Sequence, residues 1–185
     1  MTDAVTAYPV TTYAVLLRGI NLGSHNRLSM ADLRAVLARA GCTDVRTYLQ
    51  SGNGVVGWAG SAEDLERAVA VELMAHGLPV PVLVRSAAEL VSVVERNPWP
   101  GEELDPKLFH VGFLFADPDP ELVAAVDGEA LLPERFAVSD REAYLYYAGG
   151  VQRSRLDRVR LGVQMTARNW RTVLALRELA SSQPD

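Results

Sequence analysis

The chain has 185 residues, of which 49% are hydrophobic and 22% are charged, as in an ordinary globular protein. No apolar run approaches the roughly 18 residues that a membrane-spanning helix needs, so no transmembrane segment is predicted. The net charge of −5 argues against a nucleic-acid-binding protein as the default interpretation.

The first half of the chain alternates between strand and helix patterns. Strands are predicted over 13–20, 43–50, 54–58 and 79–86, and helices over 29–41 and 61–77. A serine precedes each helix as a predicted N-cap and a glycine ends it. Prolines in the last strand favour a place at the edge of a sheet.

This order, β-α-β-β-α-β, is that of a ferredoxin-like fold, in which two helices cover one face of a four-stranded antiparallel sheet. In the usual strand order 4-1-3-2, the first and third strands are neighbours. The loop that follows the first strand and the first hairpin should therefore lie at the same end of the sheet.

The second half predicts a similar series. Helices are predicted over 87–96 and 119–127, strands over 107–116, 134–140 and 142–148, and further helical stretches over 154–162 and 168–180. We therefore predict an α+β fold with two ferredoxin-like subdomains in tandem, the second lacking a clear final strand. The predicted parts are a mobile leader (1–12), the two subdomains (13–86 and 87–180) and a tail (181–185).

The stretch "LLRGINLGSHNRLSM" (16–30) passes from a strand through glycines, amides and bases into a helix. We expect it to face "QSGN" (50–53) of the hairpin. A phosphate or carboxylate would suit the guanidinium and amide donors gathered there. The candidate ligand-binding residues in these two segments are Arg18, Asn21, Asn26, Arg27, Ser51 and Asn53.

A purely structural interpretation of these loops stays open. Glycine and asparagine tolerate positive φ in tight turns, so the same residues could lock the loop against the hairpin. Neither a Walker pattern nor G-x-G-x-x-G occurs in the chain.

The C-terminal part adds weaker candidates. Residues 143–185 carry seven basic and three acidic side chains, whereas residues 89–142 carry four basic and thirteen acidic ones. The basic end could pack beside the acidic middle or form an anion-binding face. In "TARNW" (166–170), Thr166 or Asn169 is a predicted helix cap, and Arg168 and Asn169 are further ligand candidates. Arg153, Arg155, Arg158 and Arg160 recur at mixed spacings, which favours a solvated helix face.

Metal sites and nucleophiles have little support. The three histidines are isolated and no metal-ligand spacing occurs, so neither a metal nor a cofactor is predicted. Cys42, the single cysteine, is interpreted as a small buried hydrophobe. It cannot form an internal disulfide, and the N-terminus lacks the basic region of a secretory signal, so a cytoplasmic location is expected.

Three motifs carry a family resemblance: "LLRGINLG", "TYLQSGN" and "MTARNWRTVLALREL". They stand in the order found in the bacterial family called domain of unknown function 1697, and the chain resembles that family over about residues 13–180. The resemblance implies two α/β subdomains and no established activity. Here Gly54 and Gly57 interrupt the strand that follows "SGN", where the family has a continuous β-branched and aromatic strand.

Three functions are consistent with the sequence. We favour a protein that binds a small anion, either phosphate or carboxylate, at the loop and hairpin. The sequence does not decide whether that ligand is a substrate, and so whether the protein is an enzyme. The alternatives are a nucleic-acid-binding module that uses the basic C-terminal helices, and an interaction protein without a ligand. No membrane partner is expected, and the oligomeric state is not predicted.

Overall fold

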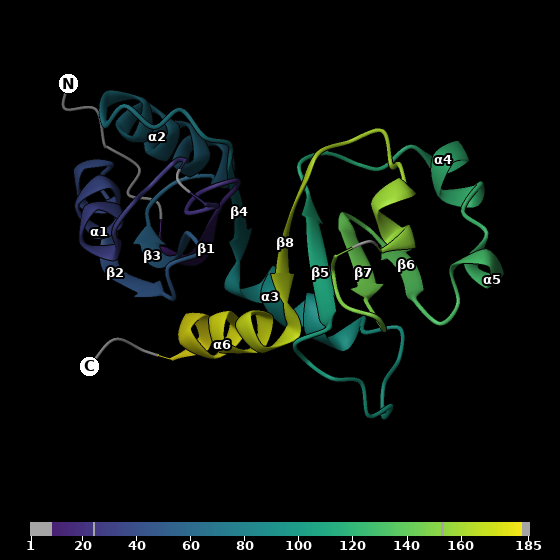
Figure 1. Cartoon of the computed structure of the whole chain (residues 1–185). Helices are drawn as coiled ribbons and strands as arrows, with labels where there is room; N and C mark the ends of the chain where they lie inside the picture. Colours follow the sequence, from purple (N-terminus) through teal and green to yellow (C-terminus); the bar gives the residue numbers. More distant parts are fainter. Residues whose placement is uncertain (1–8, 24, 153, 183–185) are drawn as a thin grey trace, which may run out of the picture. The chain divides into compact units, whose positions relative to one another are not determined.

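The computed structural model describes residues 9–23, 25–152 and 154–182. They form an α+β fold with two four-stranded antiparallel sheets (Figure 1). The chain divides into two compact units, residues 1–90 with 176–185, and residues 91–175. Most of the predicted leader (1–12) and of the predicted tail (181–185) lies outside the described residues.

The first unit contains the elements predicted for the first half of the chain. They are β1 (Thr11–Leu17), α1 (Met30–Arg39), β2 (Thr43–Tyr48), β3 (Asn53–Trp58), α2 (Ala62–Ala75) and β4 (Val82–Ser86). The sheet order is β2-β3-β1-β4, which confirms the predicted order and the edge position of β4. Leu16 at the end of β1 pairs with Asn53 at the start of β3, so the loop after β1 begins beside the β2–β3 hairpin.

Both helices of this unit begin at the predicted serines. Ser29 and Ser61 accept hydrogen bonds from the backbone N–H groups of Asp32 and Asp64, respectively. This satisfies one of the N–H groups that a helix start leaves without a partner.

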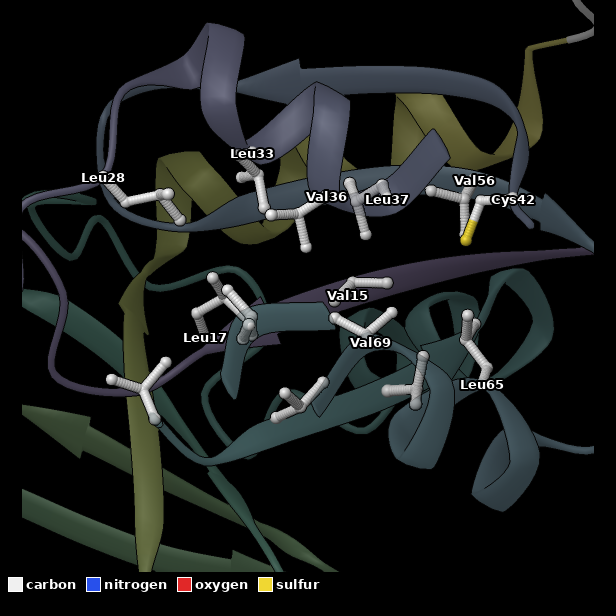
Figure 2. Close-up of a cluster of buried hydrophobic side chains, with 14 of the residues drawn as sticks. Val15, Leu17, Leu28, Leu33, Val36, Leu37, Cys42, Val56, Leu65 and Val69 are labelled. Carbon is white, nitrogen blue, oxygen red and sulfur yellow. The ribbon is translucent and has the colours of Figure 1, made fainter. Parts of the chain in front are cut away.

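The core of the first unit lies between the sheet and these two helices (Figure 2). Val15 and Leu17 of β1 point toward apolar side chains of the helices, among them Leu33 of α1 and Val69 of α2. Cys42 belongs to this core with 8% of its surface exposed, which confirms its interpretation as a buried hydrophobe. Burial of such side chains supplies most of the driving force for folding.

Gly54 has a packing role in β3. A Cβ atom there would lie 2.8 Å from Leu37 Cδ1 of α1, closer than carbon atoms approach in proteins. The strand is continuous through this residue. The glycine therefore lets α1 approach the sheet without breaking the hairpin.

The second unit carries the other sheet, in the order β6-β7-β5-β8. Its elements are β5 (Phe109–Leu114), α4 (Pro120–Ala124), α5 (Gly128–Leu131), β6 (Arg135–Ser139), β7 (Glu142–Tyr146), the 3₁₀ helix η1 (Arg155–Arg158) and β8 (Met165–Asn169). Two more helices, α3 (Ala87–Glu95) and α6 (Trp170–Ser181), contain the boundaries between the units.

Three predictions for this half were wrong. A final strand does exist, because residues 165–169 form β8 and pair with β5. Of the helix predicted over 119–127, only residues 120–124 are helical, as α4, and the short helix α5 at 128–131 was not predicted. The helical stretch predicted over 154–162 contains one 3₁₀ turn. The local pattern of these segments is weak, and long-range pairing decides their structure.

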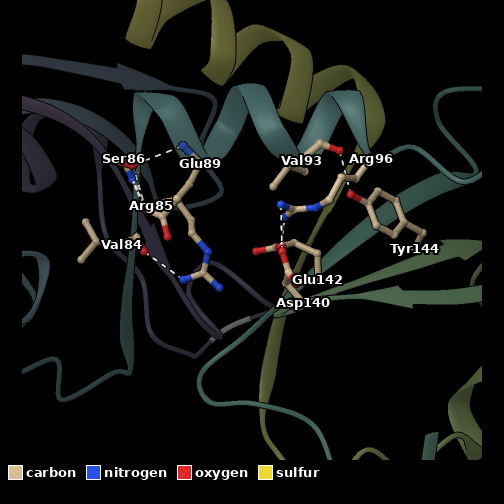
Figure 3. A network of polar contacts seen from close by, with 9 residues as sticks. All are labelled: Val84, Arg85, Ser86, Glu89, Val93, Arg96, Asp140, Glu142 and Tyr144. Atoms are coloured by element: carbon tan, nitrogen blue, oxygen red, sulfur yellow. Dashed lines mark hydrogen bonds and ion pairs between the residues drawn. The ribbon is translucent and has the colours of Figure 1, made fainter. Parts of the chain in front are cut away.

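Buried polar contacts hold the elements of the second unit together. Arg96, just after α3, contacts Asp140 at 2.9 Å and Glu142 at 2.8 Å, and Tyr144 donates a hydrogen bond to the carbonyl of Val93 at 2.7 Å (Figure 3). Glu142 is 3% exposed, so Arg96 neutralises a carboxylate that has little access to water.

Within the described residues, no helix combines the length and the apolar character that crossing a bilayer requires.

Candidate functional site

The loop after β1 folds back on itself through residues with positive φ. Gly19, Asn21, Gly23 and Asn26 have φ values of 73°, 53°, 63° and 50°. Glycine adopts this region without steric cost, and asparagine tolerates it better than most residues. The sequence therefore makes a compact loop in place of an extended connection.

Asn21 fixes this loop with its side chain. Its Oδ1 accepts from the N–H of Leu28 at 2.9 Å, and its Nδ2 donates to the carbonyls of Leu28 at 2.9 Å and Gln50 at 2.8 Å. Its backbone N–H donates to the carbonyl of Asn26 at 2.9 Å. A side chain that makes these bonds acts as part of the scaffold.

These bonds confirm that the loop and the hairpin face each other. Besides the bond from Asn21 to Gln50, the N–H of Leu17 donates to the carbonyl of Gly52 at 2.9 Å. The two segments meet although 29 residues separate Asn21 from Gln50.

Asn26, Ser51 and Asn53 make local contacts. Asn26 Nδ2 donates to the carbonyl of Gly19 at 2.9 Å. Asn53 is fully buried and donates to the carbonyl of Tyr48 at 3.0 Å and to Ser51 Oγ at 2.8 Å. These contacts agree with the purely structural interpretation, in which the same residues hold the loop against the hairpin.

A polar pocket of about 420 Å³ opens where the loop meets the hairpin. Its described lining consists of Asn21, Gly23, Arg27, Leu28, Ser29 and Gln50. Arg27 is exposed and supplies the guanidinium of this lining. Among the candidates, the pocket thus brings together Asn21 and Arg27.

The other candidates in these segments lie outside the described lining: Arg18, Asn26, Ser51 and Asn53. Arg18 is exposed at the end of β1, where its backbone N–H donates to the carbonyl of Pro81 at 3.0 Å.

Arg168 and Asn169 belong to β8 in the second unit. Arg168 is 7% exposed and donates from Nη1 to Thr166 Oγ1 and to the carbonyl of Ala167, both at 2.8 Å. Burial lowers the pKa of its guanidinium to about 10, so the group stays charged at neutral pH.

Asn169, one of the two predicted caps, begins helix α6. Its Oδ1 accepts from the backbone N–H and the hydroxyl of Thr172, both at 2.9 Å. Trp170 next to it stacks on Phe109, with 4.6 Å between ring centroids. Both residues thus anchor the start of α6 in the second unit.

The described residues include no group of three or more potential metal ligands. Burial raises the pKa of the Cys42 thiol to about 11, which keeps the thiol protonated. Burial lowers the pKa of His110, and its Nδ1 lies 3.2 Å from the carbonyl of Leu108.

Sequence reasoning missed two features. Arg85 on β4 is 2% exposed and donates to the carbonyl of Val84 at 3.0 Å (Figure 3), as Arg168 does to Ala167 on β8. A second pocket, in the second unit, is lined in part by three of the four arginines that were interpreted as a solvated helix face, and the fourth, Arg153, lies outside the described residues. The mixed spacing of these arginines gave no signal of a concave surface.

Comparison with known proteins agrees with the fold and the family resemblance. The family described as "Protein of unknown function (DUF1697)" matches residues 10–144. The chain belongs to this family. No curated protein matches it in sequence. The structure is similar to that of a conserved bacterial protein, SP0830 from Streptococcus pneumoniae, with a TM-score of 0.75 and 21% identity over 94% of this chain and 100% of that chain. At this identity the likeness establishes the fold, and the family itself carries no assigned function.

Proposed function

We propose that this DUF1697 protein binds a small anion, a phosphate or a carboxylate, in the pocket between the loop after β1 and the β2–β3 hairpin. The observation that carries the proposal is that Arg27 lines a polar pocket of about 420 Å³ whose wall Asn21 ties to the hairpin. A guanidinium offers a planar fork of donors that matches either anion.

The rigidity of the wall supports binding. The bonds of Asn21 to Leu28 and Gln50 hold the backbone of the loop in place before a ligand arrives. A site that is already ordered loses less conformational entropy on binding. Asn21 therefore acts as a positioning residue, while Arg27 makes the contact with the anion.

The charges around the pocket limit the affinity for a ligand and the ligand charge that the pocket accepts. Asp32, in the first turn of α1, accepts a hydrogen bond from Ser29 Oγ at 2.6 Å, and so places a negative charge beside the pocket. One exposed guanidinium in the lining, with a carboxylate bonded to the neighbouring Ser29, favours a singly charged ligand with a Kd on the order of 1 mM.

Binding rather than catalysis is what this lining supports. The described lining residues include no histidine, cysteine or carboxylate that could act as a nucleophile or a general base. The hydroxyl of Ser29 is the one polar group of the described lining that is bonded to a carboxylate, that of Asp32, and it is also the cap of α1.

Arg168 favours this proposal over nucleic-acid binding. It belongs to the basic C-terminal stretch but is buried in the second sheet. Its guanidinium is therefore not available to a nucleic acid at the surface.

We also propose that the two units are ferredoxin-like repeats. The sheet orders β2-β3-β1-β4 and β6-β7-β5-β8 correspond strand by strand. Arg85 and Arg168 support this relation, because each lies in the last strand of its unit and donates to the carbonyl of the preceding residue.

A buried Cys42 without a disulfide supports a cytoplasmic location.

The experiment is a thermal-unfolding series with added phosphate or acetate, against chloride at equal ionic strength. The native protein should gain stability as the anion saturates the site. Arg27→Ala should lose this gain while its melting temperature without anion stays unchanged, because Arg27 is exposed.

Arg67→Ala is the matched control, since Arg67 is an exposed arginine of α2 paired with Asp64. It should keep the full anion-dependent gain. An Arg27→Ala protein that responds to phosphate and acetate as the native protein does would refute the proposed site.

A further inference from the structure

The second unit contains a pocket of about 370 Å³ between α4, α5 and η1. Leu122, Val126, Leu131 and Val159 contribute an apolar wall. Mostly apolar pockets of this size, with a few polar groups, are typical of small-molecule sites. This pocket is separate from the loop pocket of the proposed function, since all its described lining residues fall within 91–175.

Three arginines line the same pocket: Arg155, Arg158 and Arg160. In the part of the chain that the structure describes, none of the three guanidinium groups pairs with a carboxylate. Arg158 is exposed and, within the same residues, its side chain forms no hydrogen bond. A cluster of like charges without counter-ions raises the local potential for an anion.

Backbone carbonyls hold two of these side chains in place. Arg155 Nη1 donates to the carbonyls of Ala130 at 2.9 Å and Leu132 at 3.2 Å. Arg160 Nη1 donates to the carbonyls of Asp157 at 2.6 Å and Val159 at 3.1 Å. Both groups keep further N–H donors on Nε and Nη2 that can bind a ligand.

Carboxylates of the second unit also lie near these arginines, and Asp157 stands between Arg155 and Arg158 in η1. Asp127, the acidic residue of the described lining, accepts from the N–H groups of Glu129 at 3.0 Å and Ala130 at 3.2 Å as the N-cap of α5. Glu134 accepts from the backbone N–H of Arg155 at 2.8 Å. The described lining itself still carries three arginines and one aspartate, so its own charged groups favour an anion.

We infer that this pocket binds an amphipathic carboxylate, with the carboxyl group on Arg158 and its neighbouring arginines and an aliphatic body against the apolar wall. The described lining has no aromatic ring on which a nucleobase could stack, so the apolar wall suits an aliphatic chain. The ligand should need both its carboxylate and its aliphatic chain for binding, so the test compares probes that lack one or the other.

The probe is sodium octanoate, titrated into the full chain and followed by amide chemical shifts in two-dimensional NMR. Octanoate should bind saturably, with shifts centred on residues 122–131 and 155–160. Acetate, which lacks the body, and octanol, which lacks the charge, should each bind at least tenfold more weakly than octanoate, a difference of about 1.4 kcal/mol or more.

Two variants separate the contributions of charge and shape. Arg158→Ala should weaken octanoate binding about tenfold and leave octanol binding unchanged. Ala130→Phe, at an exposed lining position of α5, should fill the pocket and weaken the binding of both octanoate and octanol. The matched controls are Arg171→Ala and Ala124→Phe, exposed positions outside the described lining, and both should bind octanoate like the native protein.

The inference is overturned if octanoate causes no saturable shifts up to about 10 mM, or if the shifts lie outside the two segments. It is also overturned if Arg158→Ala binds octanoate normally, or if an octaglutamate peptide displaces octanoate, since the latter marks an acidic-protein surface. The Arg27→Ala protein should bind octanoate normally, so this test and that of the loop pocket fail independently.

Discussion

At the scale of single residues, the amides of Asn21 and Asn53 replace backbone hydrogen bonds that irregular segments cannot make. The side chain of Asn21 hydrogen-bonds backbone groups of Leu28 and Gln50, and that of Asn53 donates to the carbonyl of Tyr48. Backbone polar groups that lose such partners in a partly buried place cost free energy. These residues shape the pocket, whereas the exposed Arg27 is the group available to a ligand.

Two substitutions of Asn21 should distinguish the contribution of its hydrogen bonds to stability from the contribution of backbone strain. Asn21→Ala loses the side-chain bonds and places alanine at φ 53°, so we expect a loss of about 2–3 kcal/mol in the free energy of unfolding. Asn21→Gly loses the same bonds without strain and should recover up to about 1 kcal/mol of that. Urea unfolding measures both. A glycine variant as stable as the native protein would show that the amide bonds contribute nothing.

Cys42 gives a prediction about pH. Its native pKa of about 11 lies above the value of about 8.5 for an unfolded thiol. The stability that the neutral thiol contributes is therefore present below about pH 8.5 and is lost as the pH rises toward 11. At about pH 8 a thiol reagent should label the native protein far more slowly than the protein in urea. Equal labelling rates in the two states would contradict the buried position of Cys42.

At the scale of elements, the contact between the loop and the hairpin depends on Gly52. This residue has φ 75°, and a Cβ atom there would lie 2.7 Å from Ile20 Cδ1 and 2.9 Å from Leu17 Cβ. The backbone must come this close for the carbonyl of Gly52 to accept from Leu17. Alanine therefore meets two obstacles at this position, an unfavourable φ and a clash.

Gly77, after α2, provides the comparison. Its φ of 81° is similar, but an added Cβ would meet nothing within 4 Å. Gly77→Ala should cost about 1 kcal/mol from φ alone, and Gly52→Ala should cost about 2–4 kcal/mol because overpacking is added. Denaturant unfolding of the two variants decides this. Equal costs would mean that the hairpin moves away without penalty.

In the second unit, the ion pairs of Arg96 connect the end of α3 to the β6–β7 turn and β7. Arg96→Met removes the guanidinium that contacts Glu142, a carboxylate that is 3% exposed, and should cost about 3 kcal/mol in unfolding free energy. Adding Glu142→Gln to Arg96→Met should restore part of this loss, because the buried charge is gone. A cost below about 1 kcal/mol for Arg96→Met would show that water solvates Glu142 in the native protein.

At the scale of the whole molecule, the sequence predicted the first unit well because its signals are local. Ser29 and Ser61 mark the helix starts, and both act as the predicted N-caps. The position of the loop beside the hairpin followed from strand order alone. The resemblance in three motifs led to the right family.

The second unit was harder to predict because its structure depends on long-range contacts. β8 contains a buried arginine, Arg168, and becomes a strand through its pairing with β5. The arginines of η1 and its neighbours line a pocket with α4 and α5, a relation that helical spacing does not reveal. Asn169 was among the predicted caps because an amide before a helix has a local signature.

The most direct measurement of anion binding at the loop pocket is an NMR titration of the native protein with inorganic phosphate. We expect saturable amide shifts at the pocket-lining residues, and no such shifts in Arg27→Ala. These residues are Asn21, Gly23, Arg27, Leu28, Ser29 and Gln50. Saturable shifts elsewhere in the chain, or none at these residues, would contradict binding at this pocket.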